Sequence, residues 1–211
     1  MLIPERVALD ADLAFQLIER ECQSNPSCQS AFPNLQQKLE QAEAFLRDLD
    51  QDLLAIDPLT GERTFAKPDP RLINRLLRSA LYSRGLRQLV PLAISEAAEG
   101  RLEVLLGMGA VLNPESPSSG ISLGMMASVL CSEDMTQMES MQHGEIFDNA
   151  LQELLIEICG FWPHQAVGQE YFEPLRSDTP ALLMSGTLDP ITPPSYAKEA
   201  MKSLTAAQHI E

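Results

Sequence analysis

Only one part of the chain, close to its carboxyl terminus, has the pattern of a buried parallel β-strand. Residues 181–186 read Ala-Leu-Leu-Met-Ser-Gly, and a short apolar run closed by glycine is typical of parallel strands covered on both faces. A loop over residues 187–194 and a predicted helix over 195–204 follow, and His209 is expected to open a second strand. One strand–helix–strand unit cannot form a stable parallel sheet alone. The rest of the sheet has to come from elsewhere.

The chain before this unit is patterned for helices. Only 5% of the residues are aromatic, and the abundance of Leu, Ala, Met, Glu and Gln favours helices over a β-sandwich. Apolar residues at helical spacing predict helices over residues 8–21, 33–46, 70–81, 86–98, 102–112 and 145–158, with an exposed turn at 57–61 and a loop at 113–120. The apolar run 125–130 fits either a helix or a strand. We therefore expect a mostly α fold with a small α/β portion.

The formal net charge of −15 limits the partners of this chain. Nucleic acids and anionic membranes are disfavoured, because binding phosphates requires clustered Lys and Arg. An acidic cleft would attract a cation such as the free amino terminus of a peptide, although acidity also simply keeps proteins soluble. No run of about 18 apolar residues is present, so no membrane span is expected, and residues 1–6 do not resemble a signal peptide.

Four cysteines fall in two pairs. Cys22 and Cys28 enclose a segment rich in Asn, Pro and Ser, which suits a small disulfide loop in an oxidising compartment, and reduced, buried thiols fit the spacing equally well. Cys131 and Cys159 are farther apart. No CxxC or HxxxH spacing supports a zinc site with these cysteines. We expect neither a metal nor another cofactor.

Asp189 is the first candidate for a functional residue, because it lies in the loop just beyond the predicted strand. In open α/β sheets, functional groups gather beyond the carboxyl ends of strands. Pro190, Pro193 and Pro194 stiffen this loop, so that the carboxylate is held in place. An orienting acid and a helix-capping or turn aspartate both fit this position.

Residues 182–193, Leu-Leu-Met-Ser-Gly-Thr-Leu-Asp-Pro-Ile-Thr-Pro, resemble the segment that carries the triad acid in α/β-hydrolases of the tripeptidyl-aminopeptidase and prolyl-aminopeptidase type. The resemblance implies that Asp189 orients a catalytic histidine. It extends upstream to the lid of that family, through the Cys22 to Cys28 loop with Phe32-Pro33 and through residues 81–94, 128–134 and 159–163. It also implies a disulfide between Cys131 and Cys159.

The same resemblance implies a domain organisation and an activity. Residues 1–7 would be a strand exit of the hydrolase core, 8–176 a helical lid (cap) domain, and 177–211 a partial α/β-hydrolase sheet. The parent protein would be a serine aminopeptidase that acts on peptides with a free amino terminus, in the periplasm or secreted. Glu133, and less strongly Asp134, would bind the protonated amine through a charge-assisted hydrogen bond. A solvated acidic pair or a helix cap is the alternative for these two residues.

A nucleophile and a catalytic histidine are not evident. Residues 120–124, Gly-Ile-Ser-Leu-Gly, fit the nucleophile-elbow pattern around Ser122, but a loop rich in Pro and Ser precedes them where an elbow needs a buried strand. His209 belongs to the predicted second strand, and His143 and His164 lie in the lid. We therefore expect a fragment, inactive alone, that pairs with the missing amino-terminal half of a hydrolase. One alternative is a non-catalytic, acidic, helical peptide-binding module, and another makes Ser122 the nucleophile of a rearranged small hydrolase.

Overall fold

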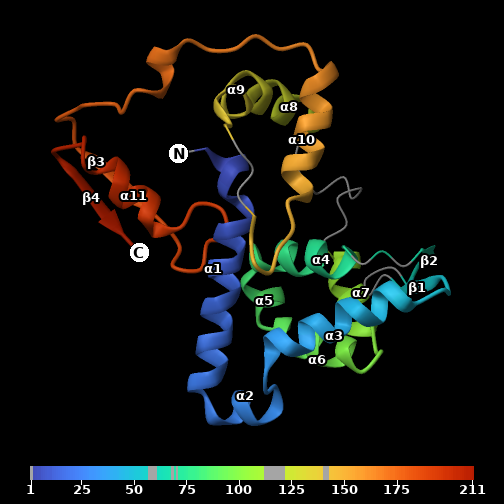
Figure 1. Ribbon diagram of the computed structural model, residues 1–211. Helices are drawn as coiled ribbons and strands as arrows, with labels where there is room; N and C mark the ends of the chain where they lie inside the picture. Colours follow the sequence, from blue (N-terminus) through green and yellow to red (C-terminus); the bar gives the residue numbers. More distant parts are fainter. Residues whose placement is uncertain (1, 57–60, 68, 70, 112–121, 140–142) are drawn as a thin grey trace. The chain divides into compact units, whose positions relative to one another are not determined.

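The computed structural model describes residues 2–56, 61–67, 69, 71–111, 122–139 and 143–211, and the described part is mostly helical with two small sheets (Figure 1). The chain divides into two units, residues 1–14 with 121–211 and residues 15–120. Helix α1 (Ile3–Ser24) runs from the first unit into the second, so it includes most of the segment that we predicted as a strand exit. The predicted domain boundaries stay predictions. The loop at 113–120 and most of the turn at 57–61 lie outside the described residues.

Residues 15–120 form a helical unit. α2 (Pro26–Ala31) begins within the loop that the Cys22–Cys28 disulfide closes and extends three residues beyond Cys28. α3 (Leu35–Asp48) packs against α6 (Val90–Ala98), and α4 (Leu72–Leu81) and α6 both pack against α7 (Glu103–Val111). The short α5 (Arg84–Arg87) follows α4. Most of the buried side chains of α3 and α6 recur at helical spacing: Leu35, Leu39, Ala42, Leu46, Val90, Ala93, Ile94 and Ala97.

The segment after α3 differs from the prediction. The sequence predicts only an exposed turn at 57–61 and no strands, but β1 (Leu53–Ile56) and β2 (Arg63–Ala66) form an antiparallel pair in which Leu53 pairs with Ala66 and Ile56 with Arg63. Gly61, just before β2, has a φ of +72°, which glycine adopts without steric strain.

In the other unit, α8 (Leu123–Ser132) packs against both α9 (Asp134–Gln137) and α10 (Ala150–Phe161). The apolar run at 125–130 is therefore helical. α10 begins at Ala150 rather than at residue 145, because the buried carboxylate of Asp12 accepts hydrogen bonds from the backbone N–H groups of Glu145, Ile146 and Phe147. These amides are held in a turn around the carboxylate and not in a helix.

The small α/β portion lies at the carboxyl-terminal end. After a short 3-10 helix, η1 (Gln169–Phe172), strand β3 (Ala181–Met184) pairs in parallel with β4 (Ala207–Ile210), and α11 (Pro194–Ala200) lies between them in sequence. The predicted strand is thus confirmed, and the predicted helix ends earlier than expected. Among the described residues, no helix is both long enough and apolar enough to cross a bilayer.

Candidate functional site

Asp189 lies in the loop that leaves β3, where its carboxylate is bound by the loop itself. Oδ1 accepts hydrogen bonds from the backbone N–H groups of Ile191, at 2.9 Å, and Thr192, at 2.8 Å. Oδ2 accepts a hydrogen bond from the Thr192 hydroxyl at 2.9 Å. The turn closes with the Asp189 N–H donating to the Gly186 carbonyl at 3.1 Å. The side chain is therefore held in one orientation, as the prolines of the loop predict.

The hydrogen bonds also set the ionisation of this carboxylate. Partial burial is the largest single influence and raises the pKa of Asp189. The backbone N–H groups of Thr192 and Ile191 and the Thr192 hydroxyl act in the opposite direction and together leave the pKa below its ordinary value. Asp189 is consequently an ionised, oriented acceptor at neutral pH.

The helix after this loop is linked to α1. The Tyr196 hydroxyl, on α11, donates a hydrogen bond to Asp10 Oδ2, and Arg6 Nη2 lies 3.3 Å from Asp10 Oδ1. Asp10 is buried. Burial, followed by the bond to Asp10, raises the pKa of Tyr196 well above its ordinary value. The loop that carries Asp189, here called the acid loop, therefore lies between β3 and α11, and α11 is anchored to α1 by the Tyr196–Asp10 bond.

Glu133 lies between α8 and α9, and Tyr171 of η1 donates a hydrogen bond to its Oε2 at 2.8 Å. The bond to Glu133, the negative charge of that carboxylate and the more distant charge of Asp134 raise the pKa of Tyr171. Glu133 is the N-cap residue of α9, but its side chain makes no capping hydrogen bond to that helix. The side-chain hydrogen bonds of Glu133, to Tyr171, and of Asp189, to Ile191 and Thr192, have no residue in common.

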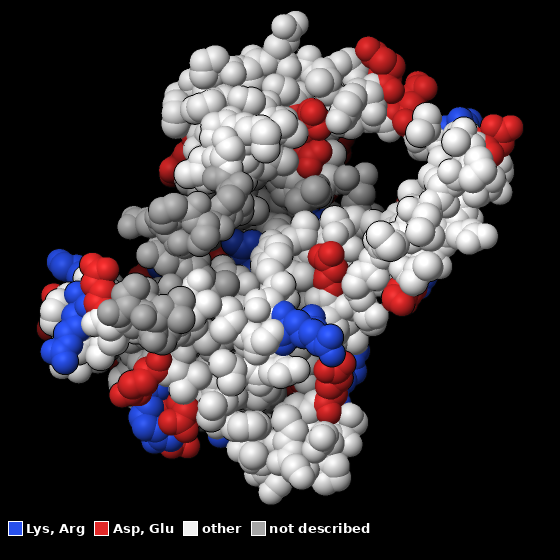
Figure 2. Space-filling model, turned by 180° about the vertical axis from the view of Figure 1, so that it is seen from behind, with Lys and Arg blue, Asp and Glu red and all other residues white. Residues whose placement is uncertain are grey.

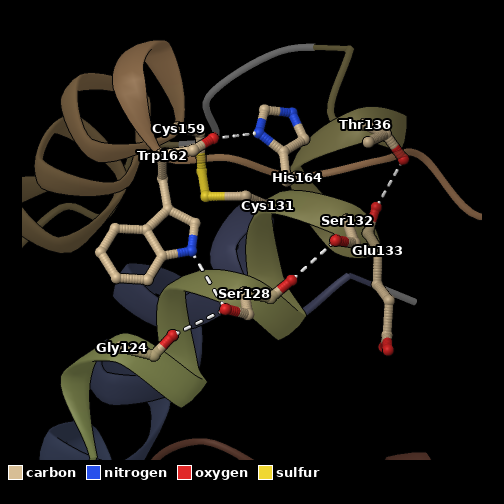
Figure 3. The surroundings of a disulfide bond; sticks show 9 residues. All are labelled: Gly124, Ser128, Cys131, Ser132, Glu133, Thr136, Cys159, Trp162 and His164. Atoms are coloured by element: carbon tan, nitrogen blue, oxygen red, sulfur yellow. Dashed lines mark hydrogen bonds between the residues drawn. A yellow bond between two sulfur atoms is a disulfide. The ribbon is translucent and has the colours of Figure 1, made fainter.

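The surroundings of Glu133 are fixed by the Cys131–Cys159 disulfide, which joins α8 to α10 (Figure 3). Trp162 Nε1 donates to the Ser128 hydroxyl at 3.0 Å, and that hydroxyl donates to the Gly124 carbonyl at 2.9 Å. His164 Nδ1 lies 2.8 Å from the Trp162 carbonyl. Both predicted disulfides are thus present. The Cys131–Cys159 bond links α8 covalently to α10, next to Glu133.

The remaining candidates have structural partners. Ser122 is the N-cap of α8, and its hydroxyl accepts a hydrogen bond from the Met125 N–H at 3.4 Å. His209 lies within β4, with its side chain 8% exposed, and its Nε2 is hydrogen-bonded with the Ser185 hydroxyl. The Asn149 side-chain amide is 2.6 Å from His143 Nδ1. Each of the three residues thus has a hydrogen-bond partner within the described part of the chain.

Comparison with known proteins bears directly on the acid loop. Residues 144–211, about a third of the chain, match the family model described as TAP-like protein, an α/β-hydrolase family. Residues 144–211 are therefore similar to TAP-like hydrolases, and we refer to them as the TAP-like segment. No curated protein and no solved structure gave a match.

The TAP-like segment contains β3, the Asp189 loop, α11, β4 and Cys159. The predicted recognition is therefore confirmed at the level of the hydrolase family. The lid resemblances of residues 22–134, with Glu133 and Asp134, lie upstream of the matched residues and stay predictions.

Two residues near the candidate site were not singled out from the sequence. Thr192 belongs to residues 182–193, whose sequence resembles the acid segment of the family, so the sequence places it near Asp189. The hydrogen bond from its hydroxyl to Asp189 is evident only in the structure. Tyr171 reaches Glu133 across 38 positions of sequence, and no local pattern signals such a contact.

Proposed function

We propose that this chain supplies the lid and the triad acid, Asp189, of a TAP-like serine peptidase that acts at the free amino terminus of peptides. The observation that carries the proposal is the Asp189 carboxylate, ionised and held at the exit of β3 within the TAP-like segment. A carboxylate has about four lone-pair positions, and Asp189 uses three of them for its own loop. The fourth can accept the Nδ1–H of a catalytic histidine, fix its tautomer and stabilise the imidazolium.

Glu133 would bind the substrate's α-ammonium group. Its Oε2 is oriented by the Tyr171 hydroxyl, and a protonated amine forms a charge-assisted hydrogen bond with such a carboxylate. Asp134, the next residue, would add negative charge. In this proposal, the enzyme selects peptides by the positive charge of their free amino terminus, which pairs with Glu133.

The nucleophilic serine, the oxyanion donors and the catalytic histidine would come from the amino-terminal half and the further core of the hydrolase. Ser122 caps a helix and His209 is engaged by Ser185, which supports the expectation that this chain alone does not hydrolyse peptides. The two disulfides, Cys22–Cys28 and Cys131–Cys159, support a periplasmic or secreted location, because disulfides persist in oxidising compartments.

The proposal is tested by building this chain, in place of the corresponding lid and acid segment, into an active TAP-like peptidase. We expect the chimera to hydrolyse a peptide p-nitroanilide with a free amino terminus. Asp189→Asn should lower kcat by about 10³–10⁴-fold, as for other triad acids, whereas Asp178→Asn, at an exposed aspartate before β3, should leave kcat unchanged. Equal kcat values for the two variants would remove Asp189 from the catalytic site.

Glu133→Gln in the same chimera separates amine binding from catalysis. The KM for the free-amine substrate should rise at least tenfold while kcat changes little, since the ammonium loses its charged partner. Glu139→Gln, an exposed carboxylate of the same region, is the matched control. A KM that responds equally to both variants would mean that only net charge matters.

The second candidate is a non-catalytic, acidic, helical peptide-binding module. It is favoured by the absence of Lys and Arg between Arg101 and Arg176. Such a module would bind cationic peptides equally well with Asp189→Asn and would never support hydrolysis.

A further inference from the structure

A hollow lies beside the Cys131–Cys159 disulfide. It has a volume of about 270 Å³ and is lined mainly by apolar groups, with Thr136 and His164 as the polar members of a lining that otherwise consists of Cys131, Met135, Met138, Ile156, Cys159 and Gly160. For comparison, an apolar cavity of about 150 Å³ can hold benzene. One large apolar side chain would therefore fit.

The part of the lining formed by the disulfide is preformed. The Cys131–Cys159 bond joins α8 to α10, and the hydrogen bond from Trp162 to Ser128 holds the end of α10 against α8 (Figure 3). The two methionines supply flexible, polarisable walls, which adapt to side chains of different shape. Ligand binding would therefore cost little conformational entropy at the site. The methionines would let the site accept apolar side chains of different shape.

The charge around the hollow is of one sign. Residues 122–173 contain nine Asp and Glu and no Lys or Arg, and Figure 2 shows Asp and Glu but no Lys or Arg over the region of α8 to α10 on the face drawn. Glu153 and Glu157 are one helical turn from Ile156 and Gly160 on α10. Both residues are exposed.

We propose that this hollow is a docking site for a cationic peptide, which inserts one apolar side chain between Met135, Met138 and Ile156 while flanking Lys or Arg residues face the carboxylates of α10. The charge decides among occupants. A second copy of this chain would bring its own net charge of −15 and an anionic membrane would also be repelled. The site involves neither Asp189 nor the amine contact of Glu133, so it is independent of the proposed peptidase function, and it gives the peptide-binding module of the second candidate function a defined binding site.

The test uses the peptide Ac-Lys-Leu-Lys-NH₂, whose blocked amino terminus cannot use an amine site. Binding to the whole chain is followed by the fluorescence of Trp162, the one tryptophan of the sequence, and by the NMR signals of the methionine methyl groups. We expect saturable binding, at least tenfold tighter than that of Ac-Lys-Ser-Lys-NH₂ and of Ac-Glu-Leu-Glu-NH₂.

Gly160→Leu is the blocking variant and Gly107→Leu its control. Both glycines are helical, and a Cβ at either position meets nothing within 4 Å. Both changes should also favour the helix, so loss of folding does not confound the result. Gly160→Leu places its side chain at the hollow and should weaken Ac-Lys-Leu-Lys-NH₂ at least tenfold, whereas Gly107→Leu should not change its affinity.

Three results would overturn the proposal. The first is no saturable binding of Ac-Lys-Leu-Lys-NH₂ at millimolar concentration. The second is equal affinity for Gly160→Leu and Gly107→Leu, or for the Lys and Glu peptides. The third is a dimer in sedimentation that Gly160→Leu dissociates, which would make a second copy the occupant.

Discussion

Thr192 determines how Asp189 is held, because it contributes both a backbone N–H and a hydroxyl to the carboxylate. These donors bind the ionised form, and so they lower the pKa of Asp189 against the effect of burial. Thr192→Val removes the hydroxyl donor and keeps the shape of the side chain. We expect the pKa of Asp189 to rise in this variant, measured by NMR titration of the side-chain carboxyl carbon.

Thr187→Val is the matched control, because Thr187 is an exposed threonine of the same loop; it should leave the pKa of Asp189 unchanged. The lowered pKa of Asp189 also makes the stability of the folded state depend on pH. A lowered pKa in the folded state stabilises that state above the unfolded value of about 3.9. The stability difference between the wild type and Thr192→Val should therefore be full at neutral pH and vanish as the pH falls through the folded-state pKa. A difference that persists at low pH would point to packing instead.

At the scale of elements, the two disulfides constrain loops of different length, with separations of 28 residues for Cys131–Cys159 and 6 for Cys22–Cys28. Loop-closure entropy predicts that replacing Cys131 and Cys159 by alanine lowers the free energy of unfolding by about 3–4 kcal/mol, and replacing the other pair by about 2 kcal/mol. Urea unfolding followed by circular dichroism measures both values.

Each cysteine pair is the control for the other, since both double variants lose two thiols of the same kind. Equal losses would show that loop length does not govern the effect. Thiol titration of the unfolded, unreduced protein should find no reactive thiol. Four reactive thiols would contradict both disulfides and, with them, the proposed location outside the cytoplasm.

Helices and strands with a local signal could be predicted from the sequence, and those set by distant contacts could not. Leu35, Leu39 and Leu46 mark one face of α3 by spacing alone, and the apolar run before Gly186 marks β3. The start of α10 depends on Asp12, more than 130 positions away. β1 and β2 are only four residues each, too short for alternation to separate them from a loop.

The candidate site shows the same division. Asp189 is found because its partners lie within three positions of it. The Glu133–Tyr171 bond and the Tyr196–Asp10 bond join distant segments, and only the folded chain brings these residues together. The sequence therefore predicts the acid, but not the contacts that orient its surroundings.

At the scale of the whole molecule, the parallel sheet of β3 and β4 has an uncovered apolar face. Leu182, Met184 and Ile210 lie on one face by register and are 57%, 76% and 56% exposed. Parallel sheets are normally covered on both faces, and exposed apolar patches mark interaction surfaces. We infer that this face is where the remaining hydrolase core packs, in line with the TAP-like match of the same residues.

The double variant Met184→Lys with Ile210→Lys tests this inference, because it should have opposite effects in two settings. In this chain alone, it should lower the binding of an apolar dye and reduce self-association without changing the circular dichroism, since the lysines face water. In the active chimera it should abolish folding or activity, since two charges would then be buried without partners. Ile56→Lys, at a residue of β1 that is 47% exposed, should do neither. If the chimera instead tolerated both lysines, the face would stay in solvent in the complete enzyme, and the sheet would have to be extended through its strand edges alone.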